Sequence, residues 1–141
     1  MINMENNPNL EQQLSQFRYI KEQREMFQNQ FDFLNASLGT LYTTKLTLDN
    51  LKDGVNENDE ILVPIGGLVS IKATIKDTKK VLVHVKNDTI IEKTVEEAIE
   101  YVLKLVEQHN TQLNFLRERI YSLDLNLQSM NQVLQNRMTQ Q

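Results

Sequence analysis

The sequence predicts an α+β fold in which a long antiparallel two-helix coiled coil carries two β-hairpins between its helices. Two long stretches repeat apolar residues every seven positions, and a short middle stretch alternates apolar with polar residues. Gly and Pro number only 4 and 2 in 141 residues. Heptads are typical of coiled coils, alternation is typical of strands, and scarce loop-forming residues favour long helices.

The first helix is expected over about residues 9–52. Its seam consists of two columns with a seven-residue repeat, offset from each other by four residues. The columns are Ile20, Phe27, Leu34, Leu41 and Leu48, and Arg24, Phe31, Leu38 and Lys45. The two cations weaken this seam without breaking the repeat.

The second helix is expected over about residues 95–138. Thr94 and Glu97 form a capping box at its start, with Thr94 as the N-cap. Its columns are Ile99, Val106, Leu113, Ile120, Leu127 and Leu134, and Val102, His109, Leu116, Leu123, Met130 and Arg137. This seam is nearly continuous, and His109 is interpreted as a polar residue that sets its register.

The two helices are similar in length, about 65 Å each at the rise of an α-helix. The hairpins between them, over about residues 60–93, return the chain beside its own start. An antiparallel coiled coil with both chain ends at one tip is the simplest arrangement. We therefore expect residues 1–141 to form a single domain.

The middle stretch predicts four strands with turns between them. Gly66-Gly67 suits a tight turn, and Asn87-Asp88 is typical turn chemistry. Two hairpins cannot bury an apolar face by themselves, so we expect the strands to assemble into an oligomer. The residues expected at this interface are Ile61, Val63, Ile65, Val69, Ile71, Ile75, Val81, Val83, Val85 and Ile91. The alternative is a sheet that packs on the base of its own coiled coil.

Composition argues against several functions. The net charge of −4 disfavours nucleic-acid binding, which needs a basic face. The chain has no Cys, and no apolar run is long enough for a membrane span, so a cytoplasmic protein is expected. Its two His residues lack metal spacing. Glu96, Glu97 and Glu100 suit the positive end of a helix dipole better than catalysis. We expect no catalytic residues, no metal and no cofactor.

The chain ends are unusually poor in charge. Arg137 is the only charged residue from position 125 onward, and Met1, Met4, Met130 and Met138 lie in the two ends. Flexible Met side chains adapt to irregular apolar surfaces. A binding role is therefore expected at the tip. The residues are Leu10, Leu14, Phe17, Leu127, Met130, Val133, Leu134 and Met138. The alternative is that Leu127, Met130 and Leu134 are ordinary seam residues.

The chain resembles the prefoldin alpha subunit family over nearly its whole length. The similarity lies in the order helix, two hairpins, helix, and in the runs 61–67, 70–73 and 94–98 (ILVPIGG, SIKA and TVEEA). Four strands match the alpha class and not the beta class. The absence of Cys further suggests an archaeal protein.

The resemblance implies a hexamer of two alpha and four beta subunits, whose strands form a β-barrel platform. It also implies an ATP-independent chaperone that grips unfolded chains at its coiled-coil tips and passes them to a group II chaperonin. A structural adaptor that binds one specific partner is the alternative. An adaptor would need charge-patterned outer faces and no uncharged, Met-bearing tip.

Overall fold

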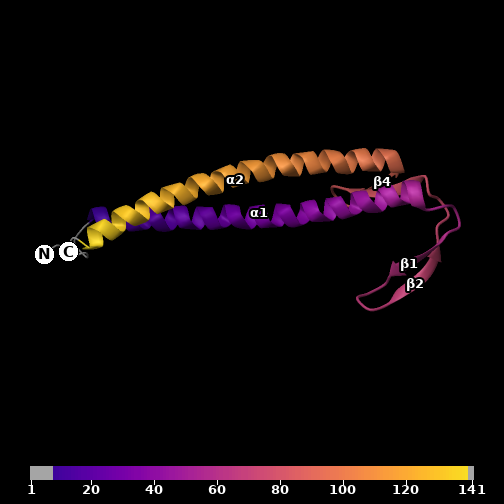
Figure 1. Cartoon of the computed structure of the whole chain (residues 1–141), viewed down its shortest axis with the longest axis horizontal. Helices are drawn as coiled ribbons and strands as arrows, with labels where there is room; N and C mark the ends of the chain where they lie inside the picture. Colours follow the sequence, from indigo (N-terminus) through magenta and orange to yellow (C-terminus); the bar gives the residue numbers. More distant parts are fainter. Residues whose placement is uncertain (1–7, 140–141) are drawn as a thin grey trace. The chain divides into compact units, whose positions relative to one another are not determined.

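The computed structural model describes residues 8–139, which form two long helices with four short strands between them (Figure 1). The elements in order are α1 (Pro8–Gly54), β1 (Glu60–Pro64), β2 (Ser70–Thr74), β3 (Lys80–Val85), β4 (Thr89–Thr94) and α2 (Val95–Thr139). The predicted order of helix, two hairpins and helix is confirmed.

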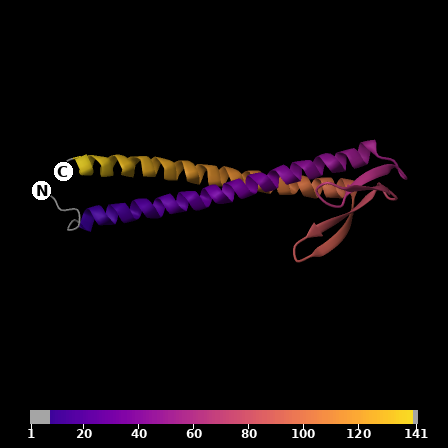
Figure 2. The same cartoon turned by 90° about the horizontal axis from the view of Figure 1, so that it is seen from below.

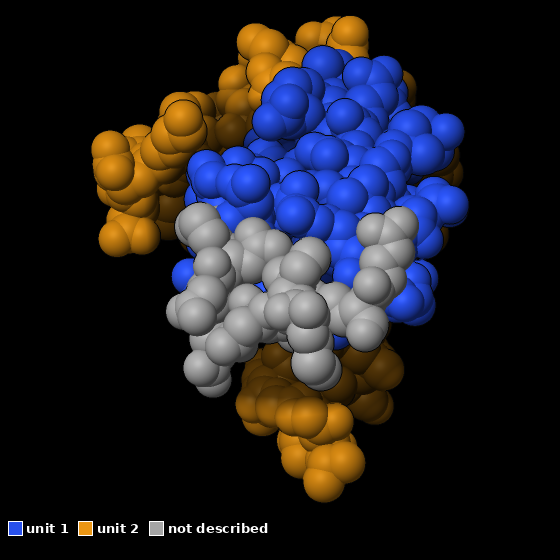
Figure 3. All heavy atoms as spheres, turned by 90° about the vertical axis from the view of Figure 1, so that its left-hand side faces the viewer, with its two compact units in different colours: residues 1–37, 109–141 blue, residues 38–108 orange. Residues whose placement is uncertain are grey.

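The chain divides into two compact units, which are coloured separately in Figure 3. The first unit contains α1 up to Ser37 and α2 from His109 onward. The second unit contains residues 38–108, with both hairpins and the adjoining helix ends. Each unit has its own buried side chains.

In the first unit, α1 and α2 run antiparallel. Gln13 contacts Arg137, Arg24 contacts Asp124, and Ser37 contacts His109, so residue numbers rise along one helix as they fall along the other. The apolar side chains buried in this unit are Leu10, Leu113, Leu116 and Leu134. All but Leu10 belong to the predicted heptad columns of α2, and the column residues of α1 in this unit are half-buried, which confirms that these columns form the seam.

Polar groups interrupt this seam at several of its described positions, two of which lie away from the chain ends. The Oγ of Ser37 lies 3.0 Å from Nε2 of His109, at a part-buried position, as expected for a polar layer between two helices. The guanidinium of Arg24 donates to Asp124 at 2.7 Å, which holds the pKa of Arg24 above its ordinary value. Arg24 is therefore paired across the helices. Because the pair is partly exposed, it contributes about 0–1 kcal/mol to stability.

In the second unit, the ends of both helices bury apolar side chains at seam spacing. The buried residues are Leu38, Leu48, Val95, Ala98, Val102 and Val106. Four of them belong to the predicted columns, while Val95 and Ala98 extend the buried face into the first turn of α2. The start of α2 is thus anchored by packing as well as by its cap.

The strands form two separate antiparallel hairpins, β1 with β2 and β3 with β4 (Figures 1 and 2). In the first, Val63 lies opposite Ile71, and in the second, Val83 lies opposite Ile91. No third strand joins either hairpin within residues 8–139. Every strand therefore has one edge whose backbone groups are left unpaired by the sheet.

The turns follow the local chemistry, with one correction. Asn87 and Asp88 both adopt positive φ angles, 62° and 57°, which these residue types tolerate. Gly66-Gly67 was expected to form a tight turn, and this prediction is wrong. The connection is a wider loop, closed by the backbone N–H of Ile65 donating to the carbonyl of Val69 at 2.9 Å. Neither glycine adopts a positive φ, so the loop does not use the conformational freedom of Gly.

The capping box at the start of α2 is confirmed. The backbone N–H of Glu97 donates to Oγ1 of Thr94 at 3.1 Å, and the backbone N–H of Thr94 donates to the carboxylate of Glu97 at 3.2 Å. These bonds satisfy two backbone donors that the helix leaves unpaired. The bond from the backbone N–H of Thr94 also holds the pKa of Glu97 below its ordinary value, because it favours the ionised carboxylate.

Replacing Glu97 by Ala is expected to lower the melting temperature at neutral pH and to matter less in acid. Because the pKa of Glu97 is depressed in the folded chain, its charge stabilises the fold above the ordinary Glu pKa. That contribution is lost as the pH falls through the depressed value. Thermal unfolding of the wild type and of Glu97→Ala, measured at neutral and at acidic pH, gives the difference in melting temperature at each pH. Glu96→Ala is the matched control, and an E97A effect that is constant with pH would refute the prediction.

Candidate functional site

The tip is defined by the eight apolar residues predicted to bind unfolded chains, and all of them lie in the first unit. Leu10 and Leu134 are only 1% and 6% exposed, while Val133 and Met138 are 48% and 52% exposed. The half-buried residues of the tip are Leu14, Phe17, Leu127 and Met130. The tip is thus closed in this structure, with two of its apolar groups already presented to solvent.

Contacts between the helices keep the tip closed. Arg137 donates from Nη1 to Oε1 of Gln13 at 2.6 Å, which links the last turns of α2 to the first turns of α1. Beside this contact lies a groove of about 220 Å³, bounded by apolar and amide side chains. The lining residues are Gln13, Gln16, Ser129, Met130, Val133 and Leu134. The groove offers apolar surface and neutral hydrogen-bonding groups, and no charged residue lines it.

The low charge of the tip holds for its described residues. Between residues 8 and 17 only Glu11 is charged, and between 125 and 139 only Arg137 is charged. Met1 and Met4, which the sequence also associates with the tip, lie outside the described residues. A surface of such low charge with Met, Leu and Gln side chains suits apolar ligands of varied sequence.

The ten residues predicted at the strand interface divide by exposure. Ile65, Val69, Ile71 and Ile91 are between 42% and 60% exposed. The half-buried members are Ile61, Val63, Ile75, Val81, Val83 and Val85. Alternate residues of β1 and β3 are therefore half-buried, as their period-2 pattern predicts. The exposed members leave apolar surface available for another chain.

Sequence reasoning missed apolar residues on the opposite faces of the hairpins. Leu62 and Leu82 are 68% and 65% exposed, Ile90 is 52% exposed, and Leu68 in the loop is fully exposed. The sequence does contain a signal for these residues, because residues 61–63 are all apolar and so are residues 81–83. Continuous apolar runs indicate strands that are buried on both faces.

Other kinds of site find little support in the part of the chain that the structure describes. No group of three or more His, Asp or Glu side chains within residues 8–139 is placed to hold a metal ion. Neither α1 nor α2 contains a stretch that is apolar and long enough to cross a bilayer. The remaining candidates for function are apolar surfaces on the helices and the hairpins.

Known proteins are similar to this chain in sequence and in arrangement. A family model described as "Prefoldin subunit" matches residues 20–140. The Prefoldin subunit alpha of Pyrococcus horikoshii is 29% identical over 75% of this chain and 72% of its own length. Prefoldin subunit alpha 1 of Methanocaldococcus jannaschii is 32% identical over 70% of this chain and 66% of its own length.

Solved structures agree with these sequence similarities. A chain of filamentous PFD from Methanocaldococcus jannaschii superposes with a TM-score of 0.71 at 25% identity, over 81% of this chain and 93% of that one. The prefoldin beta subunit from Thermococcus strain KS-1 superposes with a TM-score of 0.61 at 16% identity, over 96% of both chains. The second similarity concerns the fold alone.

Proposed function

This chain belongs to the prefoldin family of chaperone subunits, and we propose that it holds unfolded polypeptides at the tip of its coiled coil. The observation that carries the proposal is the composition of the tip. Its apolar side chains stand among amides with hardly any charge, and Val133 and Met138 are half exposed. Such a surface binds many apolar sequences weakly and needs no ATP or other cofactor.

Assembly is the second part of the proposal. We infer that the hairpins join prefoldin beta subunits in a hexamer of two alpha and four beta subunits, with the strands in a β-barrel platform. The support is the set of unpaired strand edges and exposed apolar residues on both hairpins. Several tips acting together would raise the affinity for an unfolded chain well above that of one tip. The assembly would work in the cytoplasm and pass its cargo to a group II chaperonin.

Replacing four apolar tip residues of α2 by Gln tests the tip. Gln keeps helix propensity and adds no charge, so the helix should persist while apolar contacts with substrate are lost. The variant carries Met130→Gln, Val133→Gln, Leu134→Gln and Met138→Gln. We expect about tenfold more of the assembled complex to be needed to suppress aggregation of several unrelated unfolded proteins.

The control for this variant places Gln at exposed apolar positions away from the tip, Leu103 and Tyr121. It should protect as well as the wild type. Equal protection by the tip variant would refute tip binding. Protection restricted to a single protein would favour the adaptor function instead.

A further inference from the structure

A second apolar stripe runs along α1 beside the seam. Tyr19, Met26 and Phe33 follow one another at intervals of seven residues, each one position before a seam residue. They are 60%, 49% and 75% exposed. Because seven residues are nearly two helical turns, the three side chains lie on one face of α1. This stripe repeats like a coiled-coil seam but has no partner helix in the described chain.

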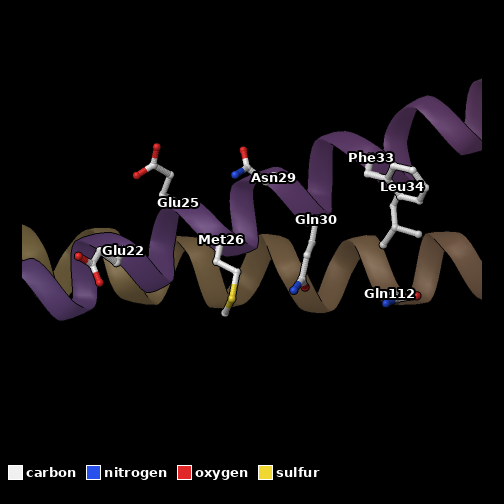
Figure 4. A pocket seen from close by; sticks show the side chains of 8 residues that line it. All are labelled: Glu22, Glu25, Met26, Asn29, Gln30, Phe33, Leu34 and Gln112. Atoms are coloured by element: carbon white, nitrogen blue, oxygen red, sulfur yellow. The ribbon is translucent and has the colours of Figure 1, made fainter.

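A groove opens along the stripe, within the first unit (Figure 4). Its volume is about 740 Å³, and Met26, Phe33 and Leu34 supply its apolar lining. Glu22 and Glu25 stand at one end of the groove, and Phe33 and Leu34 stand at the other. The groove therefore has an acidic end and an apolar end.

The charged residues that line the groove are all acidic. Its lining contains two carboxylates, the amides Asn29, Gln30 and Gln112, and no basic residue. Neither Glu22 nor Glu25 belongs to the ion pairs found among residues 8–139, which join Arg24 to Asp124 and Lys45 to Asp49. A ligand that carries a Lys or Arg at one end would complement the two carboxylates.

We propose that this groove, defined by Glu22, Glu25, Met26, Phe33 and Leu34, docks a basic amphipathic helix of another protein. The docked helix lies along α1 as an additional helix of the coiled coil. Its apolar residues pack on Met26 and Phe33, and its Lys or Arg side chains meet Glu22 and Glu25. The heptad spacing of the stripe selects a helical occupant, because a helix repeats its apolar face at the same interval.

A second copy of this chain fits the groove poorly. Two copies packed in parallel through the same stripe would bring Glu22 and Glu25 toward the equivalent carboxylates, and like charges repel. Antiparallel packing would instead set these carboxylates against the apolar end of the other copy, at Phe33 and Leu34. Arg117 and Arg119 of α2 are also engaged within the chain, where their guanidinium groups lie 5.5 and 5.6 Å from the rings of Phe31 and Phe27. The charge pattern thus favours a different protein.

Three fluorescent peptides of about three heptads test the groove. All share Leu at the a and d positions, and their flanking positions carry Lys, Gln or Glu. Binding to the chain assembled with beta subunits is measured by fluorescence anisotropy at low and high salt. We expect the Lys peptide to bind about tenfold more tightly than the Glu peptide, with the difference shrinking at high salt.

Variants of the chain then test whether the peptides bind in the proposed groove. Met26→Ser with Phe33→Ser should weaken the Lys peptide by about tenfold or more. Glu22→Gln with Glu25→Gln should weaken it by roughly fivefold and leave the Gln peptide unchanged. The matched controls are Phe115→Ser with Tyr121→Ser, and Glu100→Gln with Glu118→Gln, and both should bind like the wild type. Circular dichroism confirms that each variant keeps its helix content.

Three outcomes would overturn the proposal: equal binding of all peptides, equal binding by M26S/F33S, or self-association of the chain that this variant abolishes. The third outcome would assign the stripe to a second copy. The result is separable from tip binding, because the groove variant should still suppress aggregation and the tip variant should still bind the Lys peptide. Either proposal can therefore fail alone.

Discussion

Replacing Ile71 and Ile91 by Asp is expected to dissociate the chain from its partner subunits while both helices stay folded. The two residues lie on separate hairpins, opposite Val63 and Val83 in the strand registers. They are 48% and 42% exposed, so in the isolated chain the new carboxylates remain hydrated. The substitutions should therefore cost the single chain little.

Assembly changes that balance, because the proposed interface removes these faces from water. A buried carboxylate without a partner costs several kcal/mol, about 3 or more in measured cases. Each kilocalorie matters, since about 1.4 kcal/mol corresponds to a tenfold change in an equilibrium constant. Two such carboxylates in each chain should weaken association by more than about a thousandfold, which is enough to abolish assembly at micromolar concentration.

Light scattering coupled to size-exclusion chromatography measures the mass of the variant mixed with beta subunits. Circular dichroism measures whether its helices persist. The matched control introduces acids at two exposed apolar positions of α2, as Leu103→Glu and Tyr121→Glu. The control should assemble fully. A complex of I71D/I91D with wild-type mass would rule out assembly through these strand faces.

The seam of the coiled coil could be predicted from the sequence because its pattern is long and redundant. A column such as Leu113, Ile120 and Leu127 repeats one physical constraint many times, so single exceptions such as His109 do not obscure it. The capping box at Thr94 could also be predicted, because a hydrogen-bonded pair three residues apart depends only on local chemistry.

The exposed apolar faces of the hairpins, which carry Leu62 and Leu82, are harder to predict from the sequence. Leu62 and Leu82 follow apolar neighbours, and a short apolar run does not reveal which of its residues a chain covers by itself. The loop at Gly66-Gly67 is hard to predict for a related reason. Gly permits a tight turn but does not require one, and the register of β1 with β2 leaves a wider connection.

The sequence alone does not reveal the stripe on α1, because the seam beside it has the same period. Met26 and Phe33 precede Phe27 and Leu34, so a heptad search assigns the repeat to the seam and leaves its neighbours unexplained. Only the solvent exposure in the folded chain separates the two sets. Exposed apolar residues at regular spacing then become informative, whereas scattered ones need no explanation.

Closing the tip with a covalent bridge is expected to remove most protection against aggregation. Leu10 and Leu134 are almost fully buried, so they contact a substrate only when the ends of α1 and α2 separate. Helix ends open at low free-energy cost because few contacts hold them. The chain has no Cys, so Gln13→Cys with Arg137→Cys introduces the only two thiols. A short bis-maleimide then joins the positions whose native side chains meet at 2.6 Å.

The same bridge placed further along the coiled coil gives the matched control. Arg24 and Asp124 also meet across the helices, at 2.7 Å, and lie away from the tip. A bridge between Arg24→Cys and Asp124→Cys should leave protection unchanged, whereas the bridge at the tip should lower it by about tenfold or more. Unbridged Q13C/R137C capped with a monofunctional maleimide should protect normally. If the bridged tip protected as well as the capped one, the exposed residues Val133 and Met138 would suffice, and opening of the tip would play no part in binding.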